Sequence, residues 1–310
     1  MVAYGEGTAQ VPRYKIWNGT QWGTEGSGVS IGDTIRFVEL AASPTRDEYV
    51  MATMGSTGVV DAQVYTGGVL DAWGTSTEVV AAASNNLRRG FDIAYETDSG
   101  DAVAVACSGT EATYKIWDGT NWSASTPITL GITNNCEWIK MASDPTSDEI
   151  IMVVRDTTLG AIDYQAWVWD GGGWGNATTS GSQATANNEG IALEYEESGG
   201  QAVMVTSNGT ANNFTWKAWD GSNWSLPQTE AIGNDFAGGR ICRDDGSDAM
   251  ALVYIDAAAD NDMSYVLWNG SDWGAAAAEF EPLGNSPNGR PISCEIEVSA
   301  GRDGYLMMPY

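Results

Sequence analysis

The chain contains no histidine among its 310 residues. Histidine commonly serves as a general base and as a nitrogen ligand to zinc, so its absence excludes Ser-His-Asp groups, Cys-His groups and imidazole zinc sites. Lysine and arginine are also scarce, because 14 of them face 41 aspartate and glutamate residues, which gives a formal net charge of −27. A surface of this sign repels nucleic acid and anionic lipid, so we expect neither as a partner.

Long apolar runs are missing as well. No stretch approaches the roughly 18 consecutive apolar residues that cross a bilayer as a helix, and we therefore expect no direct membrane insertion. The first residues have neither the basic nor the apolar region of a cleaved leader. We interpret this start either as a cut from a longer precursor or as that of a protein exported without a leader.

One tryptophan motif, Trp-(Asn/Asp)-Gly-x-x-Trp, is abundant. A degenerate sixth copy begins at Tyr65 and reaches Trp73, and successive copies start 48 to 52 residues apart. A period of this length is typical of repeat architectures in which each repeat forms one small sheet. The tryptophan pairs of the five intact copies are Trp17 and Trp22, Trp117 and Trp122, Trp169 and Trp174, Trp219 and Trp224, and Trp268 and Trp273.

Each interval between copies predicts four strands. In one repeat, the alternating segment 91–95 and the apolar segment 102–106 flank an acidic turn, and a third segment, 113–117, ends at the first tryptophan. The Asp-Gly or Asn-Gly that follows is a strong signal for a tight hairpin turn, and the second tryptophan opens the fourth strand. The sequence therefore predicts an all-β, six-bladed β-propeller with four antiparallel strands per blade, in a single domain spanning residues 1–310.

The two ends of the chain are predicted to share the last blade, from residues 1–25 and 290–310, and to close the ring by pairing. Residues 1–8 resemble the second strand of other repeats, yet residues 305–308 also supply a second strand. The last blade thus has one second strand too many. Either the first segment is only a lead-in, or the surplus strand pairs with another copy of the chain.

Two interpretations of the tryptophans stay open. An indole face matches the C–H face of a pyranose, so the pairs can form a ring of sugar-binding platforms. Alternatively, large aromatic side chains fill the wedge between neighbouring blades at a fixed place in each repeat.

The turn motif resembles three groups of propellers. Six-bladed fucose-binding lectins carry a similar Trp-Asp-Gly-x-x-Trp, sialidase-type propellers carry an Asp box one residue longer, and propeller domains of bacterial and archaeal surface proteins carry Trp-Asn-Gly-x-x-Trp. The first likeness implies sugar pockets between blades built from Arg, Glu and Trp, although the ten arginines here do not recur with the blade. The second implies an arginine triad, for which Arg88, Arg89, Arg240 and Arg290 lie near the starts of innermost strands. The third implies display outside the cell, on adhesins or pili.

Other candidate sites have simpler alternatives. The four cysteines allow two disulfides, because Cys107 and Cys136 flank one blade junction and Cys242 and Cys294 lie in consecutive blades, or they are four buried thiols. No cofactor is expected except Ca²⁺, whose oxygen ligands abound, and the candidates are Asp244, Asp245, Asp248, Asp260 and Asp262. Glycosylation sequons, or turns of the same composition, occur at Asn18, Asn121, Asn176, Asn208, Asn213, Asn223 and Asn269.

These features favour a non-enzymatic, acidic repeat protein outside the cell or on its surface. Its expected role is adhesion, or a structural part of a surface filament or pilus that assembles with itself through strands. A lectin that binds surface glycans in pockets between blades is the alternative. A sialidase-like or other glycoside hydrolase is a further, less favoured alternative, since the many carboxylates offer acid pairs without specific spacing.

Overall fold

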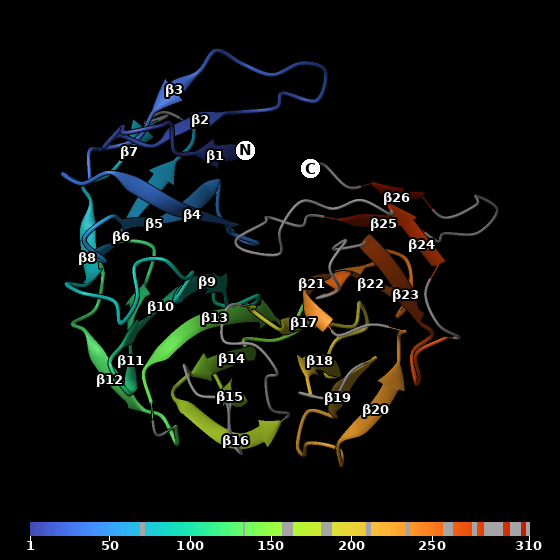
Figure 1. The fold of residues 1–310 in the computed structure, drawn as a ribbon. Helices are drawn as coiled ribbons and strands as arrows, with labels where there is room; N and C mark the ends of the chain where they lie inside the picture. The colour runs from blue at the N-terminus through green and yellow to red at the C-terminus, as the bar shows by residue number, and fades with distance from the viewer. Residues whose placement is uncertain are drawn as a thin grey trace. The chain divides into compact units, whose positions relative to one another are not determined.

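The computed structural model describes residues 1–68, 72–132, 134–156, 164–180, 188–208, 212–233, 236–256, 263–274, 278–281, 294–297 and 305–307. Every regular element in these ranges is a β-strand. None of the described residues forms a helix long and apolar enough to cross a membrane. The chain divides into two compact units, Met1–Ile139 and Lys140–Tyr310, and Figure 1 shows the strands of each.

The first unit contains three antiparallel sheets. Strands β1, β2 and β3 form a small sheet, β4 to β7 form the next with β8 as a further partner of β6, and β9 to β12 form the third. The bounds are β1 Val2–Tyr4, β2 Arg13–Lys15, β3 Gly26–Ser27, β4 Ile35–Ala42, β5 Glu48–Gly55, β6 Val60–Thr66, β7 Ala72–Trp73, β8 Thr77–Val80, β9 Phe91–Tyr95, β10 Ala102–Ser108, β11 Glu111–Trp117 and β12 Thr126–Thr129.

The second unit repeats the four-stranded pattern three times and ends in a two-stranded sheet. The unit boundary falls within β13. The bounds are β13 Cys136–Ser143, β14 Ile150–Asp156, β15 Tyr164–Trp169, β16 Trp174–Ser180, β17 Ile191–Tyr195, β18 Ala202–Ser207, β19 Asn213–Trp219, β20 Gln228–Ala231, β21 Phe236–Arg243, β22 Met250–Asp256, β23 Met263–Trp268, β24 Ala278–Glu281, β25 Glu295–Glu297 and β26 Tyr305–Met307.

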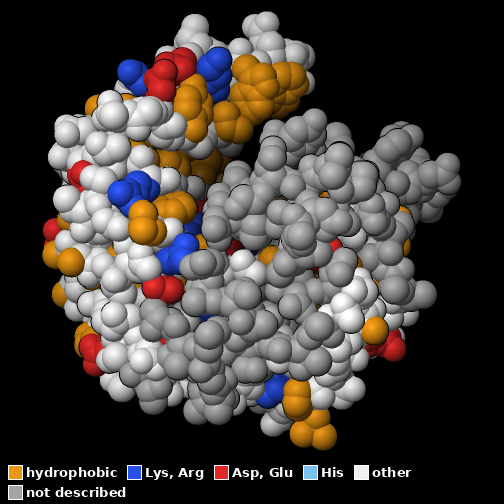
Figure 2. All heavy atoms as spheres, viewed as in Figure 1, with side chains coloured by type: hydrophobic (Ala, Val, Ile, Leu, Met, Phe, Trp, Pro, Cys, Tyr) orange, Lys and Arg blue, Asp and Glu red, His pale blue; other side chains and the backbone are white. Residues whose placement is uncertain are grey.

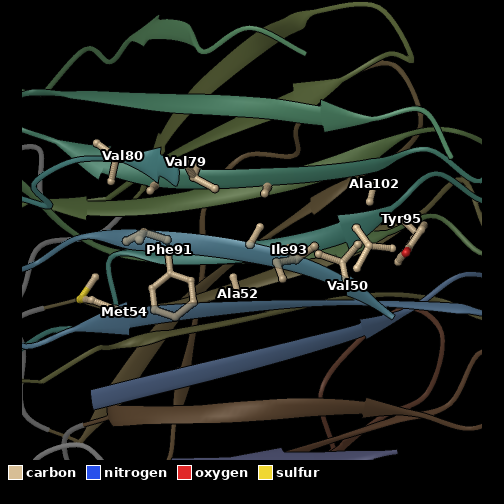
Figure 3. Packing of buried hydrophobic residues seen from close by; sticks show 14 residues of the cluster. Val50, Ala52, Met54, Val79, Val80, Phe91, Ile93, Tyr95 and Ala102 are labelled. Carbon is tan, nitrogen blue, oxygen red and sulfur yellow. The ribbon is translucent and has the colours of Figure 1, made fainter. Parts of the chain in front are cut away.

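The core of the first unit lies between the sheets β4–β8 and β9–β12. Figure 3 shows Val50, Ala52 and Met54 of β5 beside Phe91 and Ile93 of β9. These residues alternate along their strands, so each strand turns one row of side chains toward the neighbouring sheet. The middle strands are buried on both faces, which explains why they are continuous apolar runs in the sequence.

The strand predictions agree with this structure at both ends of the chain. Strand β1 pairs with β2 as a second strand pairs with a third, and β26 pairs with β25 as a second pairs with a first. Both ends therefore hold a second-type strand, as the sequence indicates. The pairing of the two ends and the single-domain boundaries remain predictions.

Both cysteine pairs are disulfides in the structure. Cys107 bonds to Cys136, and Cys242 bonds to Cys294. The first disulfide joins the end of β10 to the start of β13 within the first unit.

Candidate functional site

The tryptophan motif builds the same four-residue turn in each intact copy. In one copy the Asp118 carboxylate accepts hydrogen bonds from the backbone N–H groups of Thr120 and Asn121, at 2.8 and 2.7 Å. Gly119 between them has φ +86°, a conformation that glycine adopts without strain. Asn18, Asp170, Asp220 and Asn269 accept the corresponding backbone bonds in the other copies.

The two tryptophans that flank each turn form an aromatic couple across it. Their ring centroids lie 5.3 to 5.6 Å apart in all five copies. The degenerate copy keeps the couple, because Tyr65 and Trp73 pair across β6 and β7 with centroids 5.4 Å apart. A cross-strand aromatic pair of this kind stabilises a hairpin whatever else it contacts.

The second unit shows what covers the first tryptophan of a couple. The indole N–H of Trp219 donates to Glu149 and that of Trp268 donates to Glu196, both at 2.6 Å. In each case the glutamate belongs to the acidic turn of the preceding sheet. Trp169, Trp219 and Trp268 expose 2%, 1% and 2% of their surface, which leaves no indole face on which a sugar could stack. For Trp219 and Trp268, the packing agrees with the wedge between sheets.

The acidic turns thus form hydrogen bonds to the neighbouring sheet. Glu149 also accepts a hydrogen bond from the hydroxyl of Tyr195 at 2.8 Å, and Glu48 accepts one from Tyr95 at 2.9 Å. Burial raises the pKa of the Glu149 carboxyl, although the bonds from Tyr195 and Trp219 lower it. Burial likewise raises the pKa of Glu196.

The N-terminal couple is different, because Trp17 and Trp22 are 47% and 49% exposed. Tyr14, on the other face of β2, contacts the rings of Tyr65 and Trp73 in the next sheet. One face of the sheet β1–β3 is therefore covered, and the face that carries Trp17 is exposed in the described structure. Figure 2 shows hydrophobic side chains gathered at this end of the first unit.

A separate polar group lies where the inner strands β9 and β13 begin. Asn85 donates through its side-chain amide to the Glu137 carboxylate at 2.6 Å, and the Arg88 guanidinium lies 3.9 Å from the same carboxylate. Arg88 also lies over the ring of Trp138, 5.6 Å from its centroid. We call Asn85, Arg88, Glu137 and Trp138 the Arg–Glu–Trp cluster.

Backbone contacts and neighbouring charges hold this cluster in place. The neighbouring Arg89 is bound to two carboxylates, Glu39 at 3.2 Å and Asp92 at 3.5 Å, and its carbonyl oxygen accepts from the N–H of Ile139 at 3.3 Å. The side chains of Arg88 and Glu137 are 18% and 10% exposed, so both retain a small accessible surface. Leu87, next to Arg88, is 62% exposed.

The cluster combines two chemical features that recognise a neutral sugar. A guanidinium donates hydrogen bonds, and a carboxylate accepts them from hydroxyl groups. Trp138 is 4% exposed and lies beneath Arg88, so its indole supports the guanidinium and leaves no face on which a sugar could stack. Sequence reasoning singled out Arg88 and missed Asn85, Glu137 and Trp138. One signal was available, since the bulky Glu137-Trp138 pair opens an inner strand where Gly90 and Gly190 open the corresponding strands of other repeats.

The calcium candidates are used in turns. Asp244 accepts from the hydroxyl of Ser247 at 2.6 Å, and Asp248 accepts from the backbone N–H of Ser198 at 2.8 Å, while Asp245 is exposed. Within the described ranges, no three carboxylate or cysteine groups converge as a metal site would require. Asp260 and Asp262 lie outside the described residues.

The remaining candidates are distributed over both units. Arg240 lies 3.8 Å from Glu189, and Arg290 is outside the described residues. The sequon asparagines fall into two groups by exposure. Those at turns or strand surfaces are exposed, namely Asn18, Asn121, Asn176, Asn223 and Asn269, and the half-buried ones are Asn208 and Asn213.

Comparison with known proteins rests on structure. No protein-family model matches the chain, and no curated sequence is similar to it. Among solved structures, the BP39L lectin of Burkholderia pseudomallei matches with a TM-score of 0.59 and 10% identity, over 86% of this chain and 78% of that one. A variant of Aleuria aurantia lectin in complex with α-methyl-L-fucoside matches with a TM-score of 0.52 and 12% identity, over 87% of each chain. The Aleuria lectin is a six-bladed β-propeller.

The present chain has that fold. The SapL1 lectin in complex with α-methyl fucoside matches as well, with a TM-score of 0.50 and 18% identity, over 88% of this chain and 89% of that one. The predicted fold class, an all-β six-bladed propeller, is confirmed. At these identities the likeness is one of architecture.

Proposed function

We propose that this propeller is a non-enzymatic carbohydrate-binding protein that binds a neutral sugar at the Arg–Glu–Trp cluster. The observation that carries the proposal is the convergence of Arg88, Glu137 and Trp138 within one group of contacts. The fold adds support, because structural neighbours of the chain are lectins and two of them were solved with fucosides.

The charges of the cluster favour an uncharged ligand. Arg88 faces Glu137, and Arg89 is bound to Glu39 and Asp92. The whole chain carries a formal charge of −27, which repels sialylated or sulfated glycans over longer distances. A neutral pyranose can bridge the guanidinium and the carboxylate with two adjacent hydroxyl groups.

The decisive test is binding to an array of neutral and acidic glycans, followed by calorimetry with methyl α-L-fucoside and the strongest array ligands. We expect Glu137→Gln and Arg88→Ala to weaken binding about 10- to 100-fold, the usual loss for a hydrogen bond to a charged group. Glu111→Gln, on the exposed start of β11, is the matched control and should bind like the wild type. Wild-type protein that binds no glycan on the array would contradict the proposal.

A second variant separates this site from the tryptophan motif. Trp22→Phe alters the most exposed indole of the repeated motif and leaves the cluster intact. If binding falls in Trp22→Phe and persists in Glu137→Gln, the sugar binds the motif and the cluster is structural. Hydrolysis of fluorogenic glycosides by the wild type would contradict the non-enzymatic part of the proposal.

The role outside the cell, in adhesion or in a self-assembling filament, is a second candidate. The observation in its favour is the exposed face of the sheet β1–β3, with Val2, Trp17 and Trp22 at 40%, 47% and 49% exposure. In the second unit, Trp219 and Trp268, which correspond to Trp17, are buried and donate to a glutamate of the preceding sheet. A second copy of the chain could cover this face, and its surplus strand could extend a sheet edge.

Electron microscopy and light scattering of the native protein test this candidate. Filaments or dimers that dissociate in Trp17→Ser would support assembly through this face. Monomers at all concentrations, together with glycan binding, would leave adhesion through sugars as the surviving role.

A further inference from the structure

The Cys107–Cys136 disulfide lies directly beside the Arg–Glu–Trp cluster. Cys136 immediately precedes Glu137 and Trp138 on β13, and Cys107 lies near the end of β10. The two cysteines expose 1% and 0% of their surface. One end of the disulfide is therefore adjacent in sequence to Glu137 and Trp138.

The disulfide also holds the segment that carries the arginines. The backbone N–H of Cys107 donates to the carbonyl of Gly90 at 2.7 Å, and that of Cys136 donates to the carbonyl of Gly109 at 2.8 Å. Gly90 packs so closely that an added Cβ would lie 3.2 Å from the Cys107 sulfur and 3.0 Å from the Glu137 carbonyl oxygen. The loop that carries Asn85 and Arg88 thus packs against the disulfide and against Glu137, the residue that follows it on β13.

The contacts within the cluster are weak compared with this link. The Arg88–Glu137 distance of 3.9 Å is long for an ion pair, and the side chains of both residues are partly accessible to solvent. Cys107 and Cys136 lie 29 positions apart in the sequence, so without the disulfide the chain between them forms a long connection. The relative position of Arg88 and Glu137 would then depend on the Asn85–Glu137 hydrogen bond, the backbone hydrogen bond from Ile139 to Arg89 and the packing at Gly90.

We propose that the Cys107–Cys136 disulfide positions the sugar-binding cluster, so that sugar affinity and disulfide stability are coupled. The inference rests on the proposed function. Because coupling between two equilibria is reciprocal, a disulfide that raises sugar affinity by some factor makes sugar raise the disulfide's resistance to reduction by the same factor. A disulfide that stabilises only the fold leaves the sugar affinity of the folded protein unchanged, so sugar does not alter its reduction while the reduced protein stays folded.

The redox step is an exchange with an external dithiol such as dithiothreitol. Two electrons and two protons pass from the dithiol to the protein, the Cys107–Cys136 bond breaks into two thiols, and the dithiol closes to its cyclic disulfide. The buried sulfurs react after local opening of the site, so the exchange is measured at equilibrium.

The second disulfide provides a matched control in the same molecule. Cys242 and Cys294 link β21 to the residue before β25 in the second unit, whereas all four residues of the cluster belong to the first unit. Its removal should destabilise the fold without a specific effect on the cluster.

The test has a binding arm and a sugar-free arm. We expect C107S/C136S to weaken binding of methyl α-L-fucoside at least 10-fold and C242S/C294S to stay within twofold of the wild type, both at a temperature where circular dichroism shows folded protein. In hydrogen exchange, residues 84–90 and 136–139 should lose protection in C107S/C136S alone. Unchanged protection there, or equal losses of affinity in both variants, would overturn the inference.

The wild type supplies a third measurement that does not depend on a variant folding. With increasing ratios of reduced to oxidised dithiothreitol, saturating fucoside should shift reduction of Cys107–Cys136 and leave Cys242–Cys294 unchanged. Equal midpoints with and without bound sugar would overturn the coupling. Wild type that binds no glycan refutes the proposed function instead, and the hydrogen exchange then decides by itself whether the disulfide positions the four side chains.

Discussion

Tryptophans at one position of the repeat have two environments. Trp268, the first tryptophan of its couple, is 2% exposed and its indole N–H donates to the Glu196 carboxylate, whereas Trp17, the first tryptophan of the N-terminal couple, is 47% exposed. A buried carboxylate that loses a donor keeps its desolvation cost without the compensating bond. The burial of each indole against a neighbouring sheet, and not the motif itself, decides how much that indole contributes to stability.

We predict that Trp268→Phe lowers the free energy of unfolding by about 1 to 3 kcal/mol, through the lost hydrogen bond and the smaller ring. Trp17→Phe is the matched control and should change it by less than about 0.5 kcal/mol, as exposed substitutions do. Urea denaturation of both variants measures the difference. Equal losses would mean that the Trp268–Glu196 hydrogen bond contributes nothing to the free energy of unfolding.

The buried Glu149 carboxyl predicts a specific dependence of stability on pH. Burial raises the folded-state pKa of Glu149 above its unfolded value, in spite of the hydrogen bonds from Tyr195 and Trp219. The folded protein therefore binds a proton more readily than the unfolded chain, and this group's contribution to stability falls as pH rises through the interval above the unfolded pKa of about 4.3. Glu149→Gln removes the titration.

We expect the stability of the wild type relative to Glu149→Gln to decline as pH rises above about 4.3 and to become constant once the folded-state carboxyl is ionised. Denaturation curves of both proteins at several pH values give this difference directly. Glu111→Gln, which replaces an exposed carboxylate, should show no comparable slope. A relative stability that rises with pH would show that the two donors outweigh burial.

At the scale of the element, the hairpin turn is the unit that the repeat conserves. In the turn of the Trp169 copy, the Asp170 carboxylate accepts from the N–H groups of Gly172 and Gly173 at 3.0 and 2.9 Å, while Gly171 has φ +84°. Of these glycines, Gly171 requires the left-handed conformation, and Gly173 has open space where a Cβ would lie. The same turn thus contains a test position and its control.

We predict that Gly171→Ala destabilises the protein by about 1 to 2 kcal/mol, the cost of placing an L-residue in the left-handed region. Gly173→Ala should be neutral or slightly stabilising, because it restricts the unfolded chain. Thermal denaturation of the two single variants compares them. Equal effects would contradict the importance of this backbone conformation.

The period of the sequence was sufficient to predict the hairpins, the order of the strands and the inner strand that buries Phe91. It was insufficient where the chain departs from the period. The degenerate copy at Tyr65 splits the fourth strand into β7 and β8, both of which pair with β6. The Arg–Glu–Trp cluster has no periodic signal either. Asn85 and Arg88 lie in a connecting loop, Glu137 and Trp138 lie at the start of β13, and only the folded structure brings them together.

At the scale of the whole molecule, charge is the dominant feature. The formal charge of −27 is spread over a chain with 14 basic residues, so repulsion among carboxylates opposes the compact state. Several carboxylates avoid this cost through local hydrogen bonds, as Asp33 does with Ser56 and Thr57. Burial would raise the pKa of Asp33, but these bonds lower it to about 2. Exposed acids also repel one another over longer distances, and salt screens this repulsion.

We therefore predict that the midpoint of thermal unfolding rises by at least about 2 °C, which corresponds to about 1 kcal/mol, between 10 and 300 mM NaCl. Screening depends on ionic strength and valence and not on the identity of the ion, so MgCl₂ and CaCl₂ at equal millimolar concentration should raise the midpoint equally. A rise specific to CaCl₂ would instead reveal a calcium site, because selective coordination stabilises the folded state by mass action. The turn around Asp244, whose carboxylate already accepts from Ser247, would then be the first segment to substitute, with Asp244→Asn expected to remove the calcium-specific part and leave the sodium effect unchanged.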